Sequence, residues 1–74
     1  MRFPSKETVE RIRREYPIGC TIELVSMNDP YTKIPPGTRG TVRMIDDTGT
    51  IFADWSTGSG LGIVYGEDSC RRVD

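Results

Sequence analysis

The side chains of this sequence best suited to acid–base chemistry are two carboxylate pairs, Asp46-Asp47 and Glu67-Asp68. Adjacent side chains point to opposite sides of an extended chain, so neither pair faces one substrate from two directions. Turn formation is the simpler role for the two aspartates, since Asp bonds readily to the backbone of a turn. Histidine, the commonest general base and metal ligand, is absent from the 74 residues. We therefore expect no enzymatic activity, no catalytic residue, no metal site and no cofactor.

The charge balance argues against a general affinity for nucleic acid. The chain has 10 Lys and Arg residues against 11 Asp and Glu residues, and its formal net charge is −1. Nucleic-acid binding requires a net basic surface. The sequence has no apolar run of about 18 residues and no hydrophobic signal region at its N-terminus, so we expect a cytoplasmic protein.

The first segment that must position any functional group is a predicted helix over 5–16. Ser5 is a typical N-cap residue, and Val9, Ile12 and Tyr16 follow a single stripe of the 3.6-residue period. Pro17 disfavours helical geometry at the residue before it and ends the helix. A single narrow apolar stripe predicts a helix that packs on another element.

The rest of the chain predicts strands. The runs 40–45 and 50–55 flank the polar turn 46–49, in which Gly49 can adopt a positive φ, so they form a hairpin. Further strands are expected over 21–27, 61–65 and 70–73, with a tight turn at 66–69. The segment 28–38 contains three prolines and a glycine and predicts a long loop, with Tyr31 and Ile34 as its anchors.

These elements predict one mainly β domain over 1–74, in which the strands of 20–73 close a small five-stranded barrel and the helix packs on it. Alternation along the strands places Ile22 and Leu24 on the inner face of the first strand, and Val42 and Met44 on one face of the second. The expected inner residues are Val9, Ile12, Leu24, Val42, Ile51, Ala53, Trp55, Leu61 and Ile63.

The order of these elements resembles the SH3-like small barrel. Five stretches together resemble the bacterial and phage family catalogued as domain of unknown function 4314: 3–7, 16–19, 27–31, 35–42 and 65–69. The resemblance covers nearly all of 3–73. It implies a small protein of bacteria, phage or mobile elements with no assigned activity, and it transfers no site residues.

The resemblance also bears on the two cysteines, Cys20 and Cys70. In an SH3-like barrel the last strand pairs antiparallel with the first, so Cys70 would lie opposite the far end of the first strand, near Ser26. Cys20 precedes the start of that strand. At about 3.3 Å per residue the two thiols would be more than about 10 Å apart, beyond disulfide reach. We predict two free thiols.

Two binding functions follow as hypotheses. SH3-type barrels bind extended peptides beside the long loop, through aromatic and proline side chains, and nearby acidic residues would favour a basic ligand. Trp55 and Tyr65 share strand faces with expected inner residues, which favours a place in the core over a place at the binding surface. The candidate residues for this protein or peptide partner are Asp29, Tyr31, Pro35, Pro36, Trp55, Tyr65, Glu67 and Asp68.

The alternative is nucleic-acid binding, which requires basic side chains of the helix and strands to gather on one face. Its candidate residues are Lys6, Arg13, Arg14, Arg43 and Arg71. A purely structural or assembly role is the third hypothesis. No membrane association is expected.

Overall fold

The computed structural model describes residues 3–28 and 34–74, in which one helix precedes five strands. The elements are α1 (Lys6–Glu15), β1 (Thr21–Ser26), β2 (Arg39–Ile45), β3 (Ile51–Trp55), β4 (Gly62–Ile63) and β5 (Ser69–Arg72). All five strands pair antiparallel in one sheet, in the order β4-β3-β2-β1-β5. The predicted class, mainly β with one N-terminal helix, is confirmed. Within these residues, no helix is long and apolar enough to cross a membrane.

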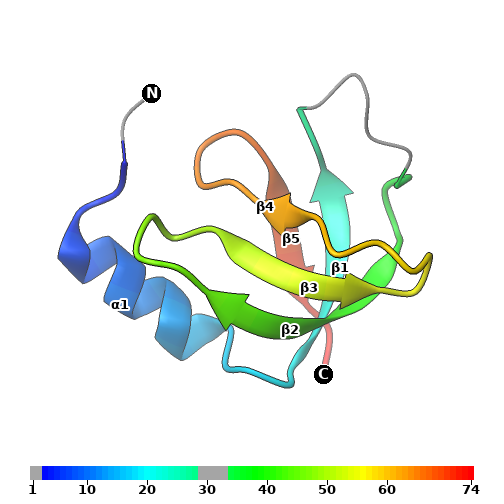
Figure 1. Ribbon diagram of the computed structural model, residues 1–74, viewed down its shortest axis with the longest axis horizontal. Helices are drawn as coiled ribbons and strands as arrows, with labels where there is room; N and C mark the ends of the chain where they lie inside the picture. Colours follow the sequence, from blue (N-terminus) through cyan, green and yellow to red (C-terminus); the bar gives the residue numbers. More distant parts are fainter. Residues whose placement is uncertain (1–2, 29–33) are drawn as a thin grey trace.

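The sheet does not close into the predicted barrel. β4 and β5 are its two edges, and no strand pairing joins them within the described residues. The strand predicted over 61–65 ends early because Val64 bonds to Asp68: Val64 N donates to Asp68 Oδ2, and Val64 O accepts from Asp68 N, both at 2.9 Å. Figure 1 shows a strongly bent sheet, in which β1 and β5 run across the direction of β2 and β3.

The helix forms where its capping residues and apolar stripe predict it. The Ser5 side chain accepts a hydrogen bond from Thr8 N, and the helix ends at Glu15, two residues before Pro17. Val9 and Ile12 are buried. They pack over Gly49, because a Cβ on that glycine would lie 3.3 Å from Ile12 Cδ1 and 3.7 Å from Val9 Cγ2. The helix therefore lies against the β2–β3 turn, as Figure 1 shows.

Asp46 organises the β2–β3 turn, as its sequence predicts. One carboxylate oxygen, Oδ1, accepts from Thr48 N at 2.9 Å, from Thr50 N at 3.0 Å and from Thr48 Oγ1 at 2.6 Å. The side-chain bond from Thr48 is the main reason that the pKa of Asp46 lies below its usual value. Gly49 closes the turn with a φ of 79°.

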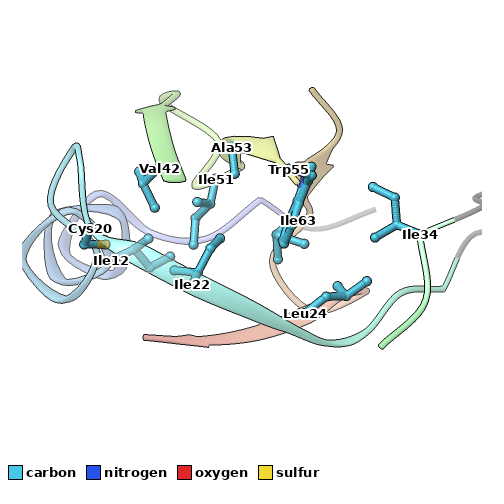
Figure 2. Packing of buried hydrophobic residues seen from close by; sticks show 10 residues of the cluster. All are labelled: Ile12, Cys20, Ile22, Leu24, Ile34, Val42, Ile51, Ala53, Trp55 and Ile63. Atoms are coloured by element: carbon cyan, nitrogen blue, oxygen red, sulfur yellow. The ribbon is translucent and has the colours of Figure 1, made fainter. Parts of the chain in front are cut away.

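The core occupies the concave side of the sheet, where side chains from α1 and from β1 to β4 point toward one another (Figure 2). All predicted inner residues except Leu61 are buried, and the expected inner position of Ile22 and the anchoring role of Ile34 are confirmed. Burying each large aliphatic side chain contributes roughly 1.5–3 kcal/mol. The buried hydrophobic residues are Val9, Ile12, Cys20, Ile22, Leu24, Ile34, Val42, Ile51, Ala53, Trp55 and Ile63.

Two predicted side-chain positions are wrong. Leu61 is 38% exposed, because β4 begins only at Gly62 and the residue before it lies outside the ladder. Met44 is 45% exposed and does not share the inner face with Val42. The β2–β3 register shifts between Val42 and Met44, and this bulge reverses the alternation of faces along β2.

The cysteines are free, as predicted. β5 pairs antiparallel with β1, and Cys70 lies opposite Leu24, one residue pair from the expected position at Ser26. Cys20 is buried at the entrance to β1, and Cys70 is half-buried. Burial raises the pKa of the Cys70 thiol to about 11.

Candidate functional site

A short turn between β4 and β5, residues 64–68, is held by hydrogen bonds within itself. Val64 O accepts from Glu67 N at 3.1 Å and from Asp68 N at 2.9 Å. Asp68 Oδ2 accepts from Val64 N at 2.9 Å. We call this segment the 64–68 turn. Because its ends are bonded at both backbone and side chain, it presents its outer residues in a defined geometry.

The 64–68 turn is also tied to the residue that begins the predicted long loop. Asp68 Oδ1 accepts from Asn28 N at 2.8 Å, and Glu67 Oε2 accepts from Asn28 Nδ2 at 3.0 Å. Next to this clamp the Ser26 and Ser69 hydroxyls lie 2.8 Å apart. Asp68 therefore uses one carboxylate oxygen for each of two backbone segments, which are 36 residues apart in the chain.

A shallow pocket of about 360 Å³ lies where these segments meet. Leu61 is its exposed apolar residue, and Glu67 and Asp68 supply two carboxylates. The volume is at the lower end of the range of ligand pockets, which suits one or two side chains of a larger partner. We call it the Leu61 pocket; it is lined by Met27, Asn28, Leu61, Gly62, Val64, Glu67 and Asp68.

A second hollow, of about 230 Å³, lies on the other side of the 64–68 turn, against α1. Ile12 and Ile63 are among its buried lining residues, and Tyr65 is its half-exposed aromatic side chain, 44% exposed. The Tyr16 hydroxyl donates to Cys70 O at 3.4 Å within it. Burial is the main reason that the pKa of Tyr16 is raised above its usual value. Asp68 borders both hollows.

The structure brings together only some of the candidate peptide-binding residues. Tyr65, Glu67 and Asp68 lie on the 64–68 turn, where Tyr65 faces the α1 side and Glu67 the Leu61 pocket. Pro35 and Pro36 are exposed just before β2. The Pro35 carbonyl accepts from Thr38 N at 3.2 Å and from Thr38 Oγ1 at 2.7 Å.

Of the remaining candidates, Trp55 does not contribute to the surface. Trp55 was a candidate both for the core and for the binding surface, and the structure buries it in the core. Its Nε1 donates to Leu61 O at 2.9 Å. Asp29 and Tyr31 lie outside the described residues.

Sequence reasoning missed five of the seven residues that line the pocket, and Leu61 and Asn28 are the two of these that matter most for binding. Leu61 is flanked by Gly60 and Gly62, and glycine on both sides was a signal that a continuous strand would not form there. Asn28 lies two residues after the end of β1 and precedes an Asp-Pro pair, a position where an amide side chain commonly bonds to nearby backbone. Its actual partners lie about forty residues away, and no local pattern predicts them.

The candidate nucleic-acid residues are divided between the helix and two strands separated by β1, and three of the arginines are paired with carboxylates. Arg13 Nη2 lies 3.0 Å from Asp47 Oδ1, and it also donates to Ile45 O at 3.2 Å. Arg43 Nε lies 3.9 Å from Asp54 Oδ1.

The third paired arginine belongs to a row of charges across β5, β1 and β2. Arg71 and Arg39 flank Glu23, at 3.0 Å and 3.5 Å from its carboxylate oxygens. Lys6 and Arg14 are exposed on α1, and neither forms an ion pair with a described residue. The candidate residues therefore form no continuous unpaired basic face.

The described residues contain no group of three Cys, Asp or Glu side chains arranged to hold a metal ion. The Leu61 pocket offers the exposed side chain of Leu61 and the carboxylate oxygens of Glu67 and Asp68. This arrangement is suited to binding an apolar group and a hydrogen-bond donor.

Comparison with known proteins identifies one family. A model of the family described as a domain of unknown function (DUF4314) matches residues 5–73. A search of curated proteins found no match, and a search of solved structures found none.

Proposed function

We propose that this chain, which belongs to the DUF4314 family, is a non-enzymatic protein-interaction domain that binds a peptide segment of its partner in the Leu61 pocket. The observation that carries the proposal is the exposure of Leu61 beside the clamped 64–68 turn. A large apolar side chain in a hollow loses its contact with water when a partner covers it, and that burial stabilises the complex.

The pocket is preorganised, which supports binding with little ordering cost. Trp55 Nε1 holds the Leu61 carbonyl at 2.9 Å from inside the core, and Asp68 joins the turn to Asn28 on the opposite wall. A partner side chain entering the pocket therefore meets walls already held in position. The hollow is small, so we expect modest affinity, as in transient interactions.

We include an SH3-like fold in the proposal. The antiparallel pairing of the first strand with the last, and the strand order that follows from it, support this assignment. The long segment between β1 and β2 and the tight turn between β4 and β5 support it as well. The open gap between β4 and β5 distinguishes this sheet from a closed barrel.

A random peptide display library panned on the purified domain tests the proposal, with an unrelated small protein as the background control. An enriched peptide is then titrated into isotope-labelled domain. We expect amide chemical-shift changes to cluster at Asn28, Gly62 and the 64–68 turn. Enrichment no greater than the background, or shift changes confined to other surfaces, would contradict the proposal.

Two variants sharpen this experiment. Leu61→Ser should weaken binding of the enriched peptide by roughly threefold to sevenfold, because a partner can bury only the 38% of Leu61 that is still exposed, about a third of the burial energy of an aliphatic side chain. Ile18→Ser is the matched control, since Ile18 is 74% exposed in the segment between α1 and β1 and lies outside the pocket. Equal losses in both variants would argue against the Leu61 pocket.

A parallel titration with labelled single-stranded and duplex DNA tests the nucleic-acid alternative. The ion-paired arginines lead us to expect no binding at physiological salt. Tight binding with a steep salt dependence, and shift changes at Arg43 and Arg71, would favour that alternative instead.

A further inference from the structure

We infer, on the basis of the proposed function, that the partner segment is basic: a Lys or Arg side chain binds Glu67 while an adjacent apolar side chain covers Leu61. Glu67 and Asp68 differ in what their oxygens already bind. The inference rests on this difference, together with the position of Glu67 beside the exposed leucine.

Asp68 is a positioning residue in this arrangement. Its Oδ1 accepts from Asn28 N, and its Oδ2 accepts from Val64 N. Each carboxylate oxygen accepts a hydrogen bond from a backbone N–H of one wall of the pocket. Its function is to hold the two walls together.

Glu67 has more hydrogen-bonding capacity left than Asp68, which already accepts one bond at each oxygen. Glu67 is exposed, and its Oε2 accepts from Asn28 Nδ2 at 3.0 Å, while Oε1 has no hydrogen-bond partner among the described residues. A carboxylate accepts about four hydrogen bonds through its two oxygens. Glu67 can therefore receive an ammonium or guanidinium group from a partner without giving up its bond to Asn28.

In the part of the chain that the structure describes, the carboxylates of the pocket are not paired with a cation, unlike those on the outer face of the sheet. Glu23 and Asp54 each lie within 4 Å of an arginine. Within the described part of the chain, neither Glu67 nor Asp68 has a Lys or Arg within that distance. Among the described residues that line the pocket, none is cationic. A basic partner complements this potential, and an acidic one is disfavoured.

Leu61 makes the recognition bipartite. It lines the same pocket as Glu67 and is 38% exposed. A lysine or arginine alone would satisfy only the carboxylate, and an apolar residue alone would cover only the leucine. A segment with both side chains next to each other uses both parts of the site, and its apolar contact removes water from around the charge-assisted hydrogen bond.

The library selection described above tests this inference when it is run on both the native domain and Glu67→Gln. Peptides enriched on the native domain should carry a Lys or Arg beside an aliphatic or aromatic residue. Glu67→Gln should bind them about tenfold more weakly and with less dependence on salt, because a hydrogen bond to a charged group is lost. Glu7→Gln, the same change at an exposed position in the first turn of α1, is the matched control and should bind normally.

The outcomes separate this inference from the proposed function. If the enriched peptides are neutral or acidic, or bind Glu67→Gln as well as the native domain, the inference is wrong, although a peptide site exists. If Glu7→Gln loses as much affinity as Glu67→Gln, the effect is general electrostatics and the inference is again wrong. Enrichment no greater than the background contradicts the proposed function itself.

Discussion

The indole ring of Trp55 lies directly against the backbone of Gly40 on the neighbouring strand. The two residues are paired across β2 and β3, and a Cβ on Gly40 would lie 2.9 Å from Trp55 Cε3. The indole is thereby fixed in the core, and its Nε1 bonds to Leu61 O at 2.9 Å. The contact of Trp55 with Gly40 thus helps to set the position of Leu61, which lies at the surface.

Gly40→Ala should destabilise the domain. The new methyl group would overlap both the indole ring and Asp54 O, which lies 3.1 Å from the Cβ position, so strands or ring must shift. Overpacking of this kind typically costs about 1–3 kcal/mol in the free energy of unfolding, measured by urea titration. Gly60→Ala is the control, because its Cβ meets only Arg43 Nη2, at 3.6 Å. Equal stability of the two variants would be inconsistent with the tight contact.

Gly49→Ala should loosen the docking of α1 on the β2–β3 turn. Gly49 combines a φ of 79° with a Cβ position 3.1 Å from Pro4 Cγ and 3.3 Å from Ile12 Cδ1. Gly37→Ala isolates the backbone part of the effect, since Gly37 has a φ of 92° and nothing within 4 Å of its Cβ position. Backbone strain alone costs about 1–2 kcal/mol. Urea unfolding should show a clearly larger loss for Gly49→Ala; a loss no greater than that of Gly37→Ala would contradict the packing.

Asp46 should make folding stability depend on acidic pH. Its pKa is lower in the folded protein than its ordinary value of 3.8, chiefly through the bond from Thr48 Oγ1. The resulting stabilisation is present above the unfolded-state pKa and is lost as the pH falls through the folded-state pKa. Asp46→Asn keeps an accepting oxygen and removes the titration. Urea unfolding between pH 5 and pH 2 should give a shallower decline for the variant, and identical slopes would count against this role.

The two thiols should react slowly in the folded protein. Cys20 is buried, and burial raises the pKa of Cys70 to about 11, so little thiolate exists near pH 8. A disulfide reagent such as Ellman's should label both cysteines rapidly in urea and slowly without it, with Cys20→Ala and Cys70→Ala separating the two rates. Labelling of Cys70 at the denatured rate would contradict its burial. Since the folded pKa is raised, the stabilisation from the neutral Cys70 thiol is present below pH 9 and lost as the pH rises toward 11.

Features that depend on neighbours in the chain were predictable. The Ser5 cap, the stop before Pro17 and the Asp46 turn each involve hydrogen bonds or backbone limits within a few residues. The alternation of apolar side chains likewise placed Leu24 and Ala53 correctly in the core. The candidate site was predictable only in part: Glu67 and Asp68 were named as candidates, but their different roles were not.

The sequence by itself determined one helix, five strands and most of the core, because short-range hydrogen bonding and periodicity encode them. Only the tertiary structure decided that the sheet stays open, that a bulge turns Met44 outward and that Leu61 is exposed. It also decided that Asp68 joins Val64 to Asn28. The bond between Asn28 and Asp68 joins segments forty residues apart, and no local pattern encodes it. The bulge between Val42 and Met44 adds one residue to β2, and a shift of one residue moves the following side chains to the other face.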